Sequence, residues 1–295
     1  MRDSSLRKTD SVEKKASFLR LHASGLADSM KSGNFRSLYR GQGIEFSGVR
    51  EYIRGDDVRS IDWNVTARMG RPYVKVFEED RELQVFLVVD TSVSMRAATD
   101  SVSKFRSAAE SAALLAVAAE SCGCPLGAAF FDGGVYFSCP PESGRPRTLL
   151  LLSKLDSVPE KAVRGSALPA ALACASRLLK KRSLVFVISD FRSAGWNRPL
   201  AALAHKNDVI ALRVTDPWDE RLPRLGTSLF TDCESGFTTM LPSSSPLFAG
   251  EWEKRNAVSV QNWRNCCLRY GAAPFVIHTD DDPLKVLMRA VSGKA

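Results

Sequence analysis

Three oxygen-bearing side chains follow one apolar segment of the 295-residue sequence at alternating positions. The run from Leu83 to Val89 is almost continuously apolar, and it leads directly into Asp90, Ser92 and Ser94. Hard cations such as Mg²⁺ prefer oxygen ligands, and Mg²⁺ usually keeps part of its water shell. One carboxylate and two hydroxyls would leave such an ion under-neutralised and able to accept another carboxylate. The spacing therefore predicts a site for Mg²⁺ or Mn²⁺ on one short loop.

Two further segments are expected to bring oxygen atoms to the same place. The apolar run 184–189 leads into Asp190, and Ser166 follows a glycine at the start of an expected helix. In open α/β sheets, ligands bind beyond the carboxyl ends of the strands, where the strand order reverses. We therefore predict that Asp190 and Ser166 complete the metal site. The plainer alternative is that an Asp after a strand serves as a helix cap or turn residue.

The segments after residue 83 alternate between patterns typical of buried strands and patterns typical of helices. Strands are expected at 83–89, 126–131, 184–189, 209–214 and 275–278, and helices at 103–120, 147–155, 168–180, 198–205, 248–270 and 283–291. Residues 135–137 are expected to form an antiparallel edge strand, 217–226 a loop and 230–241 a small hairpin. This alternation predicts an α/β fold with a doubly wound, mostly parallel sheet.

The sequence before residue 83 is expected to form two further parts. Residues 1–34 are read as a polar tail and a helix, whose apolar stripe runs from Val12 to Met30. Residues 35–82 are read as a charged, β-rich segment of hairpins and loops rather than helices, because glycines punctuate it. Residues 83–295 would then be the α/β domain.

A dense set of charged and aromatic side chains marks the β-rich segment. It comprises Arg50, Glu51, Asp56, Asp57, Arg59, Asp62, Trp63 and Arg68. Opposite charges at this density can pair through charge-assisted, often bidentate hydrogen bonds. Two interpretations remain open: a structural lid with internal ion pairs, or a face that docks a partner or regulates the metal. In the second, Asp56, Asp57 or Asp62 would bind the ion from within the chain.

The predicted metal ligands resemble the metal-ion-dependent adhesion site of von Willebrand factor A domains. The resemblance lies in Asp90-x-Ser92-x-Ser94, in Gly165-Ser166 with the following Ala171-Leu172, and in Ser189-Asp190. In that family the third-loop residue is more often Thr, whereas Ser166 keeps the hydroxyl without the methyl group. The resemblance implies a von Willebrand factor A-like, Rossmann-like domain. It also implies that an acidic side chain of a partner protein completes the shell of the ion.

A second resemblance, to the family known as domain of unknown function 58, covers about residues 35–290. It is carried by Gly41-Gln42-Gly43-Ile44-Glu45-Phe46, Arg50-Glu51-Tyr52, Gly55-Asp56-Asp57, Arg59, Ile61-Asp62-Trp63, Ala67-Arg68, Val74-Lys75, Ser189-Asp190-Phe191, Asp216-Pro217, Leu222-Pro223 and Asp232-x-Glu234-x-Gly236. Members of this family are similar to proteins thought to work beside MoxR-type AAA+ ATPases, as adaptors or co-chaperones. The resemblance implies a partner of that kind.

The composition favours a globular protein of the cytoplasm. Hydrophobic residues make up 44% and charged residues 25% of the chain. No stretch approaches the roughly 20 apolar residues that span a bilayer, and the first residues lack the apolar middle of a secretory signal. Seven cysteines, an odd count, fit a reducing compartment. We therefore expect a cytoplasmic chain without a membrane span.

Two rival functions compete with metal-dependent protein binding. The net charge of +8 would suit a nucleic-acid-binding protein, but basic residues are spread among acids and no reading motif is present. The other rival is Asp-dependent phosphoryl transfer of the haloacid dehalogenase type, with Asp90 as nucleophile. That chemistry uses a second carboxylate two residues later as general acid and base, where this sequence has Ser92. We therefore expect no enzyme activity and no nucleic-acid partner.

Overall fold

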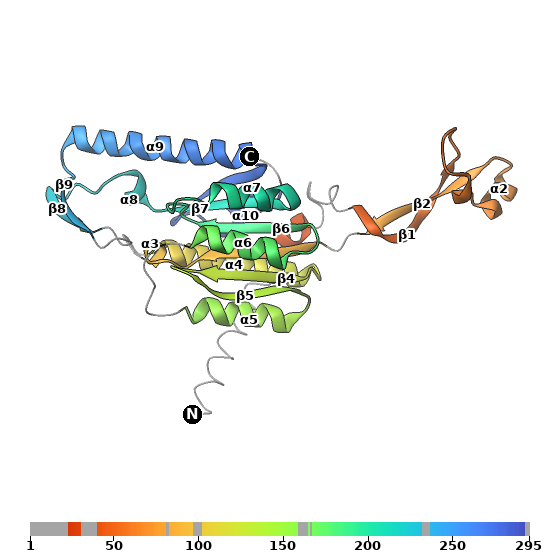
Figure 1. Cartoon of the computed structure of the whole chain (residues 1–295), viewed down its shortest axis with the longest axis horizontal. Helices are drawn as coiled ribbons and strands as arrows, with labels where there is room; N and C mark the ends of the chain where they lie inside the picture. Colours follow the sequence, from red (N-terminus) through yellow and green to blue (C-terminus); the bar gives the residue numbers. More distant parts are fainter. Residues whose placement is uncertain are drawn as a thin grey trace, which may run out of the picture. The chain divides into compact units, whose positions relative to one another are not determined.

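The chain folds as two compact units, which we describe separately. In the computed structural model, the described residues are 23–30, 40–80, 83–96, 102–158, 165, 167–231 and 237–292. The smaller unit is Asn34–Leu83, and the larger unit combines Met1–Gly33 with Gln84–Ala295. Figure 1 shows the elements of both units.

A six-stranded sheet forms the centre of the larger unit. Its order is β10 (Ala272–His278), β7 (Asp208–Thr215), β6 (Ser183–Ser189), β3 (Gln84–Asp90), β4 (Leu126–Phe131) and β5 (Val135–Glu142). Neighbouring strands are parallel from β10 to β4, and β5 is an antiparallel edge strand. This confirms the predicted α/β class, the mostly parallel sheet and the edge strand, and it is compatible with a Rossmann-like fold. The strand order reverses between β3 and β6, which are neighbours.

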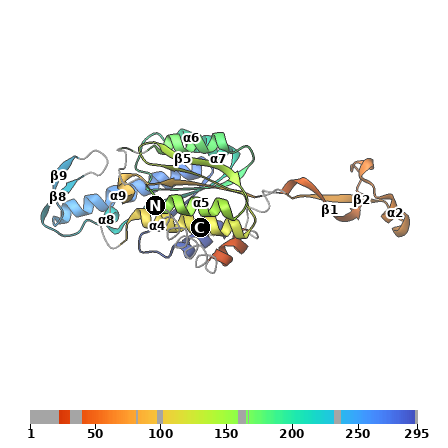
Figure 2. The same ribbon diagram turned by 90° about the horizontal axis from the view of Figure 1, so that it is seen from below.

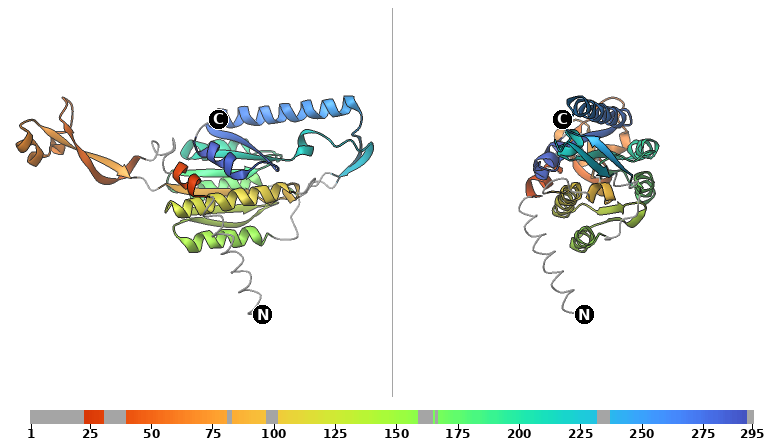
Figure 3. Two further views of the ribbon diagram at one scale, coloured as in Figure 1. Left: turned by 180° about the vertical axis from the view of Figure 1, so that it is seen from behind. Right: turned by 90° about the vertical axis from the view of Figure 1, so that its left-hand side faces the viewer.

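Helices cover both faces of the sheet, which explains why its central strands read as continuous apolar runs. The helices are α4 (Lys104–Ser121), α5 (Arg145–Asp156), α6 (Leu168–Leu178), α7 (Asn197–Lys206), α9 (Pro246–Arg269) and α10 (Pro283–Ser292). On one face, Phe86 and Val88 pack in a cluster with side chains of α6, α7 and α9. Figure 2 shows α6 and α7 on one side of the sheet and α4 and α5 on the other, and Figure 3 gives the end-on view.

The N-terminal helix is described only in its last part. Residues 23–30 are helical, and Ala23, Leu26 and Met30 of the predicted stripe are buried. Residues 12–22 of that stripe lie outside the described part of the chain. None of the described helices combines the length and the apolar character needed to cross a membrane.

The smaller unit is a long antiparallel hairpin whose connection contains a helix. Strands β1 (Arg40–Glu51) and β2 (Tyr73–Asp80) pair, and a 3₁₀ turn at Val58–Ser60 precedes α2 (Trp63–Met69). The expectation of hairpins and loops without helices is therefore wrong at α2. Asp62 caps this helix by accepting the N–H groups of Asn64 and Val65. Gly70 ends it with a left-handed φ of 69°.

Three smaller elements refine the expectations for the larger unit. Strands β8 (Thr227–Thr231) and β9 (Thr238–Pro242) form the predicted hairpin. The loop expected at 217–226 begins with a short helix, α8 (Pro217–Glu220), which Asp216 caps from the preceding position. The short loop expected to carry the serines also turns helical, as α3 (Val93–Arg96). At α8, the Asp216 side chain accepts the Trp218 N–H and so satisfies one of the free N–H groups of the first turn.

Candidate functional site

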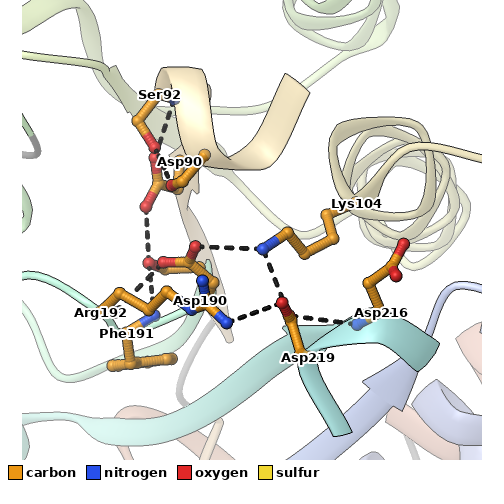
Figure 4. A network of polar contacts seen from close by, with 10 residues as sticks. Asp90, Ser92, Lys104, Asp190, Phe191, Arg192, Asp216 and Asp219 are labelled. Carbon is orange, nitrogen blue, oxygen red and sulfur yellow. Dashed lines mark hydrogen bonds and ion pairs between the residues drawn. The ribbon is translucent and has the colours of Figure 1, made fainter. Parts of the chain in front are cut away.

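The two aspartates predicted as metal ligands lie where the strand order reverses. Asp90 is the last residue of β3, and Asp190 directly follows the neighbouring strand β6. Their relative exposures are 0% and 3%, so both carboxyl groups are shielded from bulk water. Figure 4 shows the two side chains within one network of polar contacts. The topology therefore brings together residues that are 100 positions apart in the sequence.

The Asp90 carboxylate receives hydrogen bonds but no charge partner. The Ser189 hydroxyl donates to Asp90 Oδ2 at 2.6 Å, and the Ser92 N–H donates to Oδ1 at 2.9 Å. No cationic side chain among the described residues pairs with it. Burial, and next the nearby Asp190 carboxylate, raise the pKa of Asp90 to about 7. An uncompensated buried carboxylate of this kind is costly unless a proton or a cation joins it.

The hydroxyls of Ser92 and Ser94 lie beside each other at the start of α3. Their Oγ atoms are 3.1 Å apart, and both residues are buried. Adjacent ligands of an octahedral Mg²⁺ ion at about 2.1 Å are separated by about 3.0 Å. The two hydroxyls thus fit the spacing of such an ion, and together with the Asp90 carboxylate they fit its oxygen chemistry. Among the described residues no three His, Cys, Asp or Glu side chains form a metal cluster, so an ion here would depend on the serines.

Lys104 is a buried cation of this network, and no sequence motif indicated it. Its ammonium group lies 3.4 Å from Asp190 Oδ2 and 3.3 Å from Asp219 Oδ2, and Lys104 is only 4% exposed. Arg192 donates to the other Asp219 oxygen at 2.6 Å. Lys104 is the first residue of α4, where a lysine ordinarily points into solvent. Nothing in the spacing of the sequence marks it as buried.

The turn after β6 is held in a conformation that is uncommon for a bulky side chain. Phe191 has a φ of +54°. Its N–H donates to the Ser189 hydroxyl at 3.0 Å, and the Arg192 N–H donates to Asp190 Oδ1 at 3.1 Å. The same hydroxyl also donates to Asp90. These bonds tie the Asp190 turn to the Asp90 carboxylate and orient both carboxyl groups.

The third predicted loop is described only in part. Ser166 lies outside the described residues, so its place relative to Asp90 stays a prediction. Its neighbours are described: Gly165 has a φ of 93°, and the Ala167 N–H donates to the Asp132 carbonyl at 2.8 Å. This bond attaches the loop to the residue that follows β4. The loop therefore reaches the edge of the sheet that carries Asp90.

The charged segment of the smaller unit forms internal pairs and caps. Arg50 binds Asp56 through two hydrogen bonds of 2.8 and 2.7 Å, as the charge density predicted, and this pairing lowers the pKa of Asp56. Asp57 accepts the Arg59 N–H at 2.9 Å, and Asp62 caps α2. All three aspartates predicted as regulatory groups thus have local structural partners.

The remaining members of this segment are exposed. Glu51 receives a hydrogen bond of 3.3 Å from Arg71. Trp63 is 67% exposed, and Arg59 and Arg68 are exposed as well. The segment belongs to the smaller unit, whereas Asp90 and Asp190 belong to the larger one, so we describe the two surfaces separately. The segment therefore offers a charged and aromatic surface rather than a preorganised cavity.

Comparisons with known proteins place the chain within a family without assigning it an activity. An uncharacterized protein of Mycobacterium tuberculosis is 33% identical over 273 residues, which cover 90% of this chain and 84% of the relative. An uncharacterized protein of Mycobacterium avium is 31% identical over 161 residues, covering 52% of this chain and 92% of that protein.

Among solved structures, the conserved hypothetical protein BatB from Bacteroides thetaiotaomicron matches with a TM-score of 0.48. It has 19% sequence identity and covers 72% of this chain and 98% of that one. An aerotolerance-related membrane protein from Bacteroides fragilis gives a TM-score of 0.47 at 19% identity, covering 72% and 99% of the two chains. The model of one family matches residues 48–261. The chain therefore belongs to the family described as "Protein of unknown function DUF58".

Proposed function

We propose that this chain is a metal-dependent protein-binding module that holds one Mg²⁺ or Mn²⁺ ion at the carboxyl ends of strands β3 and β6. The carrying observation is the Asp90 carboxylate, which is fully buried, has no cationic partner in the described part of the chain, and lies next to the paired hydroxyls of Ser92 and Ser94. The resemblance of these positions to the metal-ion-dependent adhesion site of von Willebrand factor A domains supports the same assignment. Ser166 and Asp190 are proposed as the further ligands, bound directly or through water.

Each residue then has a distinct role in binding. Asp90 supplies the negative charge, and Ser92 and Ser94 supply neutral oxygen atoms. Ser189 orients Asp90 through its 2.6 Å hydrogen bond. Lys104 pairs with both Asp190 and Asp219, and Arg192 also pairs with Asp219. Two cations therefore offset these two carboxylates, and the protein provides little surplus negative charge to the ion. A bound divalent cation would supply an electrophilic position that accepts a further carboxylate from a partner.

The proposed partner is a MoxR-type AAA+ ATPase, with this chain acting as an adaptor or co-chaperone. The proposal rests on the family resemblance and on the chemistry of a site that accepts an acidic side chain. The exposed charged segment around Arg59, Trp63 and Arg68 is the proposed second contact. Arginine and tryptophan are enriched at the energetic centres of protein interfaces.

We propose no catalytic turnover at this site. Position 92 holds a hydroxyl 3.1 Å from another hydroxyl, where Asp-dependent phosphoryl transfer would use a carboxylic acid. Asp281 and Asp282, two other carboxylates that could assist such chemistry, have local roles instead, since Asp281 accepts the His278 N–H and Asp282 accepts the Leu284 N–H. Phosphatase activity that is lost in Asp90→Asn would contradict this part of the proposal.

Titration calorimetry with Mg²⁺ and Mn²⁺ tests the metal site directly. Asp90→Asn keeps the size of the side chain but removes its charge and exchanges one acceptor oxygen for an NH₂ donor. Metal affinity should therefore fall by about 100-fold or more while the circular dichroism spectrum is kept. Asp208→Asn is a matched control, because Asp208 begins β7 at the opposite edge and pairs with Arg182. Equal metal affinity in wild type and Asp90→Asn would refute the site.

Capture of the partner tests the binding function. Purified MoxR-type ATPase should be retained by the wild-type chain in Mg²⁺ and released by EDTA, and Asp90→Asn should fail to retain it in either buffer. Retention that is equal in Mg²⁺ and in EDTA would show that any contact between the two proteins is independent of the metal.

A further inference from the structure

A cavity of about 420 Å³ opens beside β7, between α7 and α9. Its inner wall contains the buried side chains of Phe191, Trp196 and Trp263 and the guanidinium-bearing Arg213. Exposed polar residues of α7 and α9 form the rim, among them Arg255. The volume lies within the range of about 300–1,000 Å³ that small-molecule sites usually have. None of the described residues that line it is acidic.

Arg213 is a buried cation without an ion pair. It is 6% exposed, and no hydrogen bond or salt bridge joins it to another residue in the described part of the chain. Its guanidinium carbon lies 5.7 Å from the centre of the Trp263 ring. Burial is the main cause that lowers the pKa of Arg213, which shows that the neighbouring acids do not offset its desolvation. Buried charges are normally paired.

The acids closest to Arg213 are already engaged elsewhere. Asp190 and Asp219 influence Arg213 electrostatically. Both, however, pair with Lys104, and Asp219 also receives a 2.6 Å hydrogen bond from Arg192. The guanidinium of Arg213 is thus left to face the cavity with its charge uncompensated. An anion entering from solvent would supply the missing partner.

Two further features of the cavity wall favour an anion. The indole N–H of Trp263 is buried and has no hydrogen-bond acceptor among the residues that the structure describes. Helix α7 starts at the cavity, and its N-cap residue Trp196 provides no side-chain cap to the free N–H groups of the first turn. Such groups carry a partial positive charge. The Phe191 ring packs against both tryptophans, and its centroid lies 5.4 Å from that of Trp196 and 5.4 Å from that of Trp263.

We propose that this cavity binds a small organic anion, with its carboxylate on Arg213 and its apolar body against the aromatic wall. The guanidinium fork matches the two oxygens of a carboxylate, and Arg255 at the rim adds a second, weaker attraction. The proposal uses none of the metal ligands and does not rest on the proposed function. It assigns a second site to the larger unit, on the face of the sheet that α7 and α9 cover.

Calorimetry and tryptophan fluorescence test the proposal with three probes: benzoate, inorganic phosphate and benzylammonium. Fluorescence is suitable because Trp196 and Trp263 line the cavity. Benzoate should bind saturably and change the fluorescence, and benzylammonium, which has the same ring and the opposite charge, should not. Phosphate should bind more weakly than benzoate, since it lacks an apolar body. The proposal is overturned if benzoate fails to saturate, if benzylammonium binds equally well, or if phosphate binds more tightly.

Variants of the two arginines locate the site. Arg213→Met introduces an apolar side chain of similar length and should weaken benzoate binding by at least about tenfold. Arg255→Gln changes an exposed residue of the rim and should weaken benzoate binding by a few-fold while the fold is kept. Arg182→Gln, at the opposite edge of the sheet, should bind benzoate like wild type. Unchanged affinity in both Arg213→Met and Arg255→Gln would overturn the assignment. Asp90→Asn should still bind benzoate, which separates failure of this site from failure of the metal site.

Discussion

Two aspartates in different surroundings, one after an apolar run and one in a charged segment, end in opposite electrostatic states. Asp90 ends a buried strand and has no cationic partner among the described residues, and its pKa is raised to about 7. Asp56 lies in the charged segment of the smaller unit, where Arg50 binds it through two hydrogen bonds and lowers its pKa. The first carboxylate is desolvated by the core of the sheet, and the second stays in contact with water. Burial in one case and an ion pair in the other therefore move the pKa of the same residue type in opposite directions.

The comparison also separates two ways of binding a partner. At the carboxyl ends of β3 and β6, hydrogen bonds from Ser92 and Ser189 hold the Asp90 carboxylate in place without a ligand. In the charged segment, the aspartates instead form helix caps and an ion pair. The exposed apolar side chains of this segment are Ile53, Val58, Trp63 and Met69. A preorganised site suits one ion of defined geometry. An exposed mixed surface suits a protein whose contacts are spread over a larger area.

The pH dependence of metal binding is the largest effect that follows from this contrast. A divalent ion binds the ionised carboxylate, and protons compete with it below the Asp90 pKa of about 7. The affinity for Mg²⁺ should therefore rise by about 100-fold from pH 5 to pH 8, measured by calorimetry at constant ionic strength. Asp56→Asn should show the same profile, since the lowered pKa of Asp56 lies below this window. A flat profile in the wild type would remove the distinction between the two carboxylates.

The stability of the metal-free protein should respond to the same proton. Because the folded-state pKa of Asp90 is raised from 3.8 to about 7, the folded chain holds this proton more tightly than the unfolded chain. The resulting stabilisation is complete below the unfolded pKa and is lost as the pH rises toward 7. In EDTA, the thermal unfolding midpoint of the wild type should therefore decrease as the pH is raised from about 4 to about 7. The decrease should be steeper than that of Asp90→Asn. Parallel curves for the two proteins would show that Asp90 titrates normally.

Lys104 offers a way to shift the buried network toward greater metal affinity. Removing its ammonium group in Lys104→Met leaves Asp190 and Asp219 without their shared cation. Their charge should then strengthen Mg²⁺ binding by about tenfold, at a cost in stability because buried carboxylates lose their partner. Calorimetry and thermal unfolding measure the two effects together. Weaker Mg²⁺ binding in Lys104→Met, with the fold intact, would instead make Lys104 a support of the metal site.

The sheet could be predicted from the sequence because its signal is local. The apolar run before Asp90 and the one before Asp190 identify β3 and β6, and the alternation of strands and helices predicts a mostly parallel sheet. Helix α2 was missed because the glycines around it suggested only turns. Its signals, Asp62 before the helix and Gly70 after it, are short and also occur in loops.

The site could be predicted only where it depends on the ends of strands. Asp90 and Asp190 come together because β3 and β6 are neighbours, which the switch-point rule anticipates. The places of Lys104 and Arg213 depend on how helices pack across distant parts of the chain, and a single charged residue in a helix or strand gives no sign of burial. Their partners, or the lack of them, became visible only in three dimensions.

The smallest expected effect belongs to the exposed pair in the charged segment. Asp56→Asn removes one partner of Arg50 but leaves an amide that can still accept the Ile53 N–H. Solvent-exposed ion pairs contribute little to stability and are screened by salt. The variant should therefore keep the wild-type thermal midpoint and Mg²⁺ affinity, with any difference vanishing in high salt. A large, salt-resistant loss of Mg²⁺ affinity in Asp56→Asn would mean that the two units share one metal site, and it would end the division of roles between Asp90 and Asp56.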